Sequence, residues 1–255
     1  MKRSLKVSQA FSRAADSYDQ HALVQSFTAQ RLAAKILTQE NSSLGTILEV
    51  GCGTGMLSRH LIAHAGHYVL TDFSLPLLQK AHEQVRGEHV FPLVVDGEHP
   101  CFSASFDIIV SNLALHWFQD PKEALIRLVA CLKPGGRLYI TTLGNNTFHE
   151  WRTAHSFVDA PCGILDFISF GQLKDWLPLS GIRQVEEEWV TTAPLNALEF
   201  LRSLKGMGGH LPHPGHRPLP HRTFKKVMDI YDLKPKTSYQ ILYGTYQKAE
   251  TMREE

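Results

Sequence analysis

The chain has 255 residues, 43% of them hydrophobic and 20% charged, which fits one large α/β domain with or without an inserted cap. Its formal net charge of +1 excludes a general attraction to nucleic acid or anionic lipid. The N-terminus lacks a signal-peptide pattern, and no apolar run is long enough for a membrane-spanning helix. The four cysteines contain no CxxC pair and are expected to be reduced thiols. Together with the missing signal peptide and spanning helix, they predict a cytoplasmic protein with no membrane partner.

The first forty residues are predicted to form two helices, at 8–18 and 22–38. Hydrophobic residues of the second helix are spaced roughly along one face. We therefore expect this face to be buried; its members are Leu23, Phe27, Leu32, Ile36 and Leu37.

From residue 44 the pattern changes to short apolar runs separated by helical segments. Runs at 47–50, 67–71, 90–95, 106–111 and 137–142 predict five strands. Ser74 and Asp120 are the expected N-caps of two intervening helices. Strands that alternate with helices indicate right-handed crossovers and a parallel sheet, so the predicted fold is Rossmann-like α/β.

The last third of the chain predicts a helix at 170–179 and two more strands, at 183–192 and 238–246. These strands complete a seven-stranded, mostly parallel sheet. The residues between them are too many for an ordinary connection and predict a helical cap over the active site. The expected organisation is one domain, with N-terminal helices at 1–40, a core at 44–192 and 237–248, and a substrate cap at 193–236.

A glycine-rich loop follows the first predicted strand, with Gly51, Gly53 and Gly55 at alternate positions. The carboxyl end of that strand is where open α/β sheets bind ligands. A dinucleotide fingerprint would need glycine in place of Met56. Glu49 precedes the loop, and a carboxylate suits the ammonium of an amino acid better than a pyrophosphate. The pattern favours a nucleoside that carries an amino acid.

The segment LEVGCGTG resembles motif I of the class I S-adenosylmethionine methyltransferases. The resemblance implies that Asp72 binds the ribose hydroxyls, that Asp96 and Gly97 meet the adenine edge, and that Asn112 lies beside the reactive methyl. Each acid taken alone is equally compatible with a helix cap or a surface residue. The expected cofactor-binding set is Glu49, Gly51, Cys52, Gly53, Gly55, Asp72, Phe73, Asp96, Gly97 and Asn112.

Further segments resemble the malonyl-acyl-carrier-protein O-methyltransferases of biotin synthesis. The two that discriminate best are the N-terminal block at 11–19 and the Leu-Lys-Gly block at 204–208; the others lie at 111–117, 170–173 and 237–243. The resemblance implies that the free carboxylate of a malonyl thioester receives the methyl group of S-adenosylmethionine. A carboxylate is ionised at neutral pH, so the reaction needs positioning and exclusion of water instead of a general base.

Five residues are the candidates for this chemistry. Tyr18 is expected to close over the cofactor, although a buried aromatic with a satisfied hydroxyl would look the same. His116 and Trp117 are expected to wall the methyl-transfer chamber, with core packing as the alternative for Trp117. Arg202 and Lys205 are expected to hold the substrate carboxylate, unless Arg202 only pairs with a surface acid.

Residues 200–236 carry eight Lys or Arg and only two acids. Acyl carrier proteins are acidic, so this basic cap is the expected docking surface for malonyl-acyl carrier protein, with a solvated face without a partner as the alternative. The same segment holds four histidines, whose spacing matches no zinc motif and predicts a loop without a metal.

Two other functions stay open at this stage. The chain could methylate a free small acid such as trans-aconitate, or bind the cofactor without catalysis. Methylation of nucleic acid is disfavoured, because Asn112 is followed by Leu113 and Ala114 where amino-methylating enzymes carry a proline pair.

Overall fold

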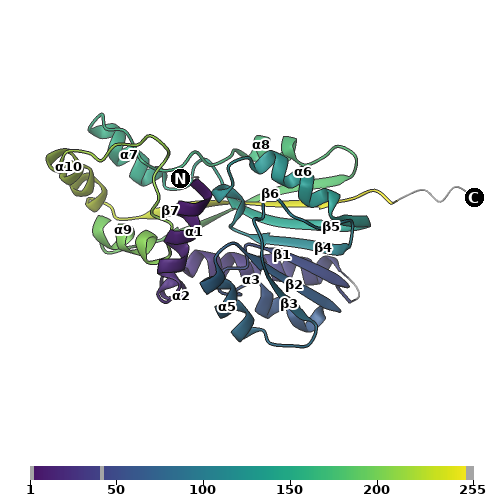
Figure 1. Ribbon diagram of the computed structural model, residues 1–255. Coiled ribbons are helices and arrows are strands. Elements are labelled where there is room, and N and C mark those ends of the chain that lie inside the picture. Colours follow the sequence, from purple (N-terminus) through teal and green to yellow (C-terminus); the bar gives the residue numbers. More distant parts are fainter. Residues whose placement is uncertain (1–2, 41–42, 251–255) are drawn as a thin grey trace, which may run out of the picture.

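The computed structural model describes residues 3–40 and 43–250. Seven strands form one sheet in the order β3-β2-β1-β4-β5-β7-β6, and every neighbouring pair is parallel except the two that contain β7 (Figure 1). The strands are β1 Thr46–Val50, β2 His67–Asp72, β3 Val90–Val94, β4 Phe106–Asn112, β5 Leu132–Leu143, β6 Ile182–Thr192 and β7 Thr237–Gln247. The predicted Rossmann-like α/β fold is confirmed.

Ten α-helices are described in these residues. They are α1 Arg3–Ala14, α2 Tyr18–His21, α3 Leu23–Gln39, α4 Ser58–Leu61, α5 Leu75–Gln84, α6 Pro121–Ala130, α7 His149–Phe157, α8 Phe170–Trp176, α9 Ala197–Gly206 and α10 His221–Asp232. Two short 3-10 helices, Ile62–His64 and Leu115–Trp117, follow α4 and β4. No helix among the described residues is both long enough and apolar enough to cross a bilayer.

Alternate residues of the central strands supply two separate hydrophobic cores, because successive side chains of a strand point to opposite faces. Ile47 and Ile108 pack on one face with α3, α4 and α5. Leu48 and Ile109 pack on the other with α6 and α8. Figure 1 shows α3 and α5 on one side of the sheet and α6 and α8 on the opposite side. Because helices cover both faces of the sheet, the edge at the carboxyl ends of the parallel strands is the place left for a binding site.

The apolar face predicted for α3 is only partly correct. Leu32 and Ile36 are buried, but Leu23 is 71% exposed and Phe27 lies under the guanidinium of Arg31, 5.5 Å from its ring centroid. The buried face instead includes small residues, Thr28, Ala29 and Ala33, beside Val24. Small side chains allow the helix to approach the sheet closely, a feature that a search for large apolar residues does not detect.

The two predicted N-caps behave differently. Asp120 caps α6, since its carboxylate accepts the backbone N–H of Glu123 at 3.1 Å. Ser74 stands at the N-cap position of α5, but its hydroxyl makes no capping bond and instead lies 2.9 Å from the hydroxyl of Ser12. The predicted N-cap position of Ser74 is therefore confirmed, but its side chain joins α1 to α5 instead of capping the helix.

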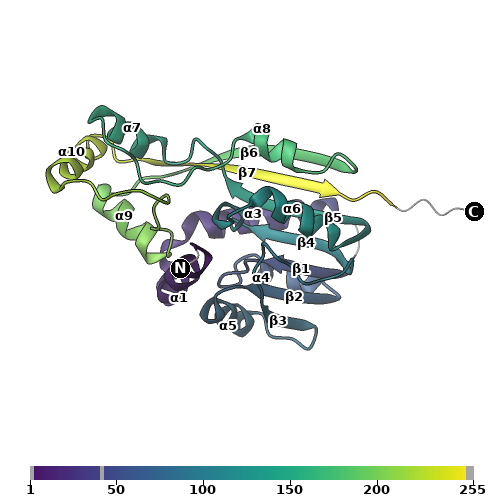
Figure 2. The same ribbon diagram turned by 45° about the horizontal axis from the view of Figure 1, so that its top comes forward.

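The cap gathers α9 and α10 beyond one end of the sheet, and α7 joins them (Figures 1 and 2). The predicted core range of 44–192 contains α7, yet this helix packs chiefly against α10. Trp151 of α7 lies 5.4 Å from the ring of Tyr231 and 5.5 Å from that of Phe200, centroid to centroid. These aromatic contacts come from three separate sequence segments, so α7 belongs physically with the cap helices.

Candidate functional site

A cleft opens at the carboxyl ends of β1, β2 and β4, as expected for this class of sheet. Gly51 and Gly53 line it from the loop after β1, Asp72 and Phe73 from the end of β2, and Asn112 from the end of β4. Gly51 has a φ of +68°, and a Cβ there would lie 2.6 Å from that of Ala114. The loop therefore requires glycine to bring the backbone this close to the floor of the cleft.

The carboxylate of Asp72 organises the part of this cleft at the end of β2. One oxygen accepts the backbone N–H of Gly53 at 3.0 Å, and the other accepts that of Ser74 at 2.8 Å. Burial raises the pKa of Asp72 to about 6, against the effect of these backbone donors. A buried carboxylate of this kind gains from further donors, such as two neighbouring hydroxyls.

Three predicted cofactor residues do not line the cleft. The carboxylate of Glu49 is buried behind the glycine loop, where one oxygen accepts the hydroxyls of Ser58 and Tyr68. Burial raises the pKa of Glu49 to about 7. Cys52 is buried in the core, and Gly55, with a φ of +86°, packs on Ala81. These three residues support the loop from behind, while Gly51 and Gly53 present their backbone to the cleft.

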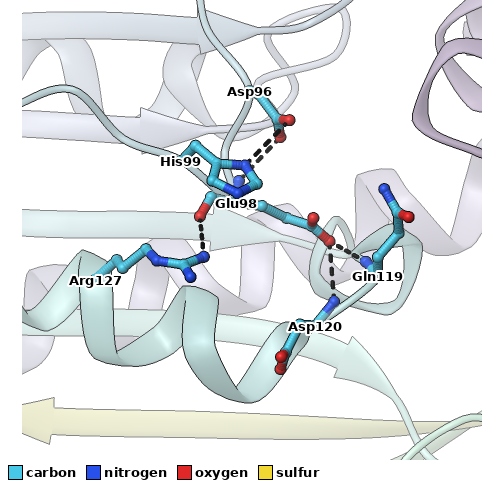
Figure 3. A network of polar contacts seen from close by, with 6 residues as sticks. All are labelled: Asp96, Glu98, His99, Gln119, Asp120 and Arg127. Atoms are coloured by element: carbon cyan, nitrogen blue, oxygen red, sulfur yellow. Dashed lines mark hydrogen bonds and ion pairs between the residues drawn. The ribbon is translucent and has the colours of Figure 1, made fainter. Parts of the chain in front are cut away.

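The side of the cleft formed by the loop after β3 carries the hydrogen-bond network drawn in Figure 3. A carboxylate oxygen of the buried Glu98 accepts the backbone N–H groups of Gln119 and Asp120, while Arg127 donates to the Glu98 carbonyl at 3.0 Å. Asp96 accepts the Glu98 backbone N–H at 3.1 Å. The network joins the loop after β3 to the loop before α6 and thereby fixes one wall of the cleft.

Gly97 lies within that wall. A Cβ on it would lie 2.5 Å from Val50 Cγ1 and 3.0 Å from Phe118 Cζ, so only glycine fits. Asp96 and Gly97 both line the cleft, as predicted. Asp96, Glu98 and His99 each offer an atom that could bind a metal ion, and these three atoms lie within 4.8 Å of one another. Among the described residues this is the one group of that kind, and none of the cap-loop histidines belongs to it. Its carboxylates already accept backbone donors.

The segment after β4 is held in a strained conformation. Leu113 has a φ of +51°, uncommon for a residue with a bulky side chain, and its N–H bonds to the Thr141 hydroxyl at 3.0 Å. Asn112 accepts that hydroxyl through Oδ1 and donates through Nδ2 to the carbonyl of Gln25. Asn112 therefore both lines the cleft and ties β4 to α3.

A second cavity, of about 490 Å³, adjoins the cofactor cleft. Four residues line both spaces, Phe11, Tyr18, Leu113 and Trp117, so they mark the passage between them. The rings of Phe11 and Trp117 meet edge to face with centroids 5.1 Å apart. We refer to this second cavity as the chamber. It brings together the predicted residues Tyr18, His116 and Trp117 with residues of α7, α9 and the cap loop.

The chamber is lined without a carboxylate, ammonium or guanidinium group. The described residues that line it include no Lys, Arg, Asp or Glu; their polar groups are those of Tyr, Trp, Gln and His. Burial lowers the pKa of His116 to about 3, so its ring is neutral at physiological pH. Burial also raises the pKa of the Tyr18 hydroxyl above its usual range, with the negative charge of Asp72 adding to the effect.

Three polar atoms of chamber residues are buried without a hydrogen-bond partner among the described residues: Nδ1 of His116, Oε1 of Gln25 and Nε2 of His155. Unpaired buried polar atoms are rare in native proteins and indicate a ligand or ordered water. Gln25 and His155 were not predicted as site residues. His155 occurs in a helix assigned to the core, so the sequence pattern contained no sign of its placement.

Arg202 and Lys205 lie outside the chamber. The side chains of α9 that line it are Leu201 and Leu204, while Arg202 and Lys205 are exposed on the other face of the helix. They line a separate groove beside α1. The spacing correctly put both cations on one face of α9, and that face lines the groove beside α1 and not the chamber, where Leu201 and Leu204 of α9 lie.

Residues 11–19 and 204–208, the two segments that resemble the malonyl-acyl-carrier-protein O-methyltransferases most specifically, lie against each other in the structure. The hydroxyl of Ser17 donates to the carbonyl of Gly206 at 2.8 Å, and a Cβ on Gly206 would lie 2.0 Å from the ring of His21. Gly208, with a φ of +77°, rests on Phe11. The N-terminal helices thus form the joint between cofactor cleft and cap.

Comparison with known proteins agrees with this geometry. The family described as "Methyltransferase domain" matches residues 48–140. The chain is 34% identical over 255 residues to a protein from Magnetococcus marinus named malonyl-[acyl-carrier protein] O-methyltransferase, covering 97% of this chain and 94% of the relative. It is also 34% identical to the biotin biosynthesis bifunctional protein BioCD of Bordetella avium, covering 95% of this chain and 52% of that protein.

Solved structures show the same fold at lower identity. The crystal structure of the YcgJ protein from Bacillus subtilis superposes with a TM-score of 0.63 at 16% identity, covering 87% of this chain and 99% of that protein. At this identity the likeness concerns the fold only. The cap and the chamber must be interpreted from the residues of this chain.

Proposed function

The chain belongs to the malonyl-[acyl-carrier protein] O-methyltransferase family, and we propose that it methylates the free carboxylate of a malonyl group held as a thioester on an acyl carrier protein. S-Adenosylmethionine, bound in the cleft, supplies the methyl group. The observation that carries the proposal is the chamber, lined without Lys, Arg, Asp or Glu among the described residues, which adjoins the cofactor cleft at Phe11, Tyr18, Leu113 and Trp117.

The cofactor fits the cleft on three observations. Asp72 presents a buried carboxylate to the ribose side. Gly51 and Gly97 line the cleft at places where a Cβ would clash with Ala114 and Val50, so glycine lets the walls of the cleft pack closely there. Glu49 lies behind the loop, where its negative charge when ionised favours the ammonium of the amino-acid moiety across the backbone. These residues would hold the nucleoside and direct its methyl group toward the passage.

The chamber residues act by positioning the substrate carboxylate. A carboxylate needs no deprotonation at neutral pH, so a neutral His116 is suited to donate a hydrogen bond and not to accept a proton. One carboxylate oxygen forms the new bond to the methyl carbon, the carbon–sulfur bond breaks, and its electron pair stays on sulfur. Well-oriented approach is worth about 7–11 kcal/mol in such reactions.

The absence of a cation from the described chamber lining has a chemical consequence. A carboxylate held by neutral donors keeps more nucleophilic character than one paired with Arg or Lys, and exclusion of water by the aromatic walls adds to this. The methyl ester is uncharged and fits the apolar lining better than the carboxylate does. Both effects favour the forward reaction.

The partner and the pathway follow from the same proposal. The acidic carrier protein docks on basic residues of the cap, which has eight Lys or Arg between positions 200 and 236. The methyl ester resembles the apolar end of a fatty acyl chain and so can be elongated toward biotin, the pathway in the name of the Bordetella avium relative.

A substrate panel tests the proposal. Purified protein and S-adenosylmethionine are incubated with malonyl carrier protein, malonyl-coenzyme A, free malonate and trans-aconitate, and kcat/KM is measured for each. We expect kcat/KM for malonyl carrier protein to exceed that for both free acids at least about a hundredfold, equivalent to about 2.8 kcal/mol. A free acid as the best substrate would instead assign the chain to small-acid methylation.

A further inference from the structure

A basic groove lies between α1 and α9, outside the chamber. Four cations line it: Lys6 and Arg13 from α1, and Arg202 and Lys205 from α9. The remaining described residues of its lining are neutral or histidine, and none is an Asp or Glu. Both views in Figures 1 and 2 show α1 lying beside α9, so two segments almost two hundred residues apart combine their charge at this place.

The charges of this groove are not compensated within the described protein. All four side chains are exposed, and none takes part in an ion pair with another described residue. By contrast, Asp16 at the end of α1 pairs with Lys80 and is turned toward α5. Four unpaired cations around one concave surface create a local positive potential that attracts an anionic partner.

The groove adjoins the chamber. His210 and Leu211 line both spaces, so they form the boundary between them. The pKa of His210 is lowered, mainly by burial and also by the positive charge of Lys205. The ring is therefore kept neutral at this boundary. A ligand whose anionic part rests in the groove can reach the chamber with an uncharged extension that passes these two residues.

Building on the proposed function, we propose that this groove is the docking site of the carrier protein. An acidic surface of the carrier contacts Lys6, Arg13, Arg202 and Lys205, and the phosphodiester of its prosthetic arm lies among them. The uncharged arm then passes His210 and Leu211, placing the malonyl end beside His116. The site thus requires α1 as well as the cap, which the sequence pattern of the cap alone did not predict.

The groove suits this ligand better than the exposed basic residues of α10. Lys225 and Lys226 of α10 are exposed too, but neither lines the chamber or the groove. A carrier protein bound at Lys225 and Lys226 would rest on a surface that shares no lining residue with the chamber into which its arm must reach. The charge of the groove, its concave form and its common wall with the chamber all point to one ligand that is anionic at one end and neutral along its arm.

The test is the double charge reversal Lys6→Glu/Arg13→Glu, which leaves both α9 and the chamber unchanged. Two quantities are measured at low salt: the Kd for holo-carrier protein, and kcat/KM with malonyl carrier protein and with malonyl-N-acetylcysteamine, a thioester without phosphate or protein. We expect Kd and KM for the carrier substrate to rise at least about tenfold, with kcat/KM for the small thioester within about twofold of wild type.

Two control variants sharpen the result. Arg86→Glu/Lys174→Glu changes net charge equally at exposed residues outside the groove and should leave carrier binding within about twofold of wild type. Lys225→Glu/Lys226→Glu tests the α10 face. Loss of carrier affinity in the α10 variant with retention in the groove variant would overturn the proposal, as would equal losses on both thioesters. An unchanged Kd for S-adenosylhomocysteine verifies that each variant is folded.

The proposal and the function on which it rests fail in different ways. If the wild-type protein methylates no malonyl thioester, the proposed function is wrong whatever the Kd for the carrier. If it methylates malonyl carrier protein and the groove variant binds the carrier as well as wild type does, only the docking site is wrong.

Discussion

At the scale of single residues, the two parts of the site differ in charge. The cofactor cleft is built around a buried carboxylate, Asp72, whereas the chamber has no carboxylate, ammonium or guanidinium among its described lining residues and offers neutral groups such as those of His116 and Gln25. This division matches the chemistry: the cofactor brings hydroxyls and positive charge, and the substrate brings a carboxylate that must stay reactive. Each half gives a prediction.

The pKa of Asp72, raised to about 6, predicts how cofactor affinity depends on pH. Ribose hydroxyls donate to the ionised carboxylate, so the competent form is lost as pH falls through this pKa. At pH 5 about one molecule in ten is competent, and the apparent Kd for S-adenosylhomocysteine should rise about tenfold relative to pH 8. Calorimetry at both pH values measures this, and Asp72→Asn should bind weakly at each. A flat profile for the wild type would contradict the ribose role.

His116 provides the second residue-scale prediction. Replacing it with leucine removes a hydrogen bond to a charged group, a loss of about 1.5–3 kcal/mol, so kcat/KM for malonyl carrier protein should fall at least about tenfold. His116→Gln keeps a neutral donor and should restore most of the activity. The Kd for S-adenosylhomocysteine should be unchanged in both. Wild-type activity in His116→Leu would exclude the positioning role.

At the scale of elements, the N-terminal helices join the cofactor cleft to the cap. Gly206 allows α9 to approach His21 of α2, and Gly208 allows the following turn to rest on Phe11. Phe11 and Tyr18 then line both the cleft and the chamber. The short segments 11–21 and 204–208 are therefore mutually dependent, and substitution in one should be compensated in the other.

This dependence predicts a rescue. Gly206→Ala places a methyl group against the His21 ring and should destabilise the protein by about 1–3 kcal/mol. In a His21→Ala background the same change has space, and because Gly206 lies in α9 the alanine should be neutral or stabilising through its higher helix propensity. Denaturant unfolding of the wild type, the two single variants and the double variant gives the coupling free energy between positions 206 and 21. Additive effects would contradict the packing role.

The strand–helix alternation was predictable because each apolar run ends at a turn residue or an acid. The runs became β1 to β4 with small shifts in their ends, whereas β5 begins at Leu132, five residues before the predicted run, and includes the Lys-Pro-Gly-Gly segment. The buried face of α3 was not predictable in the same way, since it is made largely of Thr28, Ala29 and Ala33. Nor was the position of α7, whose contacts with Phe200 and Tyr231 join residues far apart in sequence. Local periodicity does not contain such information.

At the scale of the whole molecule, two cavities share a wall made of two N-terminal residues, Phe11 and Tyr18, and two residues that follow β4, Leu113 and Trp117. The cofactor half could be predicted to a large extent, because Asp72, Asp96 and Asn112 each follow a strand and parallel strands end at one edge. The substrate half could not, because its lining runs from Phe11 to Tyr239 and depends on how the cap folds back. Charge alone suggested Arg202 as the carboxylate ligand, whereas the cap presents leucines to the chamber.

The central claim is that the methyl group passes from the cleft to a carboxylate in the uncharged chamber. A single-turnover reaction with S-adenosylmethionine labelled in its methyl group, followed by mass spectrometry of malonyl carrier protein, tests it most directly. The account predicts one labelled methyl per acyl group, present as an ester whose hydrolysis in base releases labelled methanol. Label at another atom, or bound cofactor with no labelled acyl product, would contradict it.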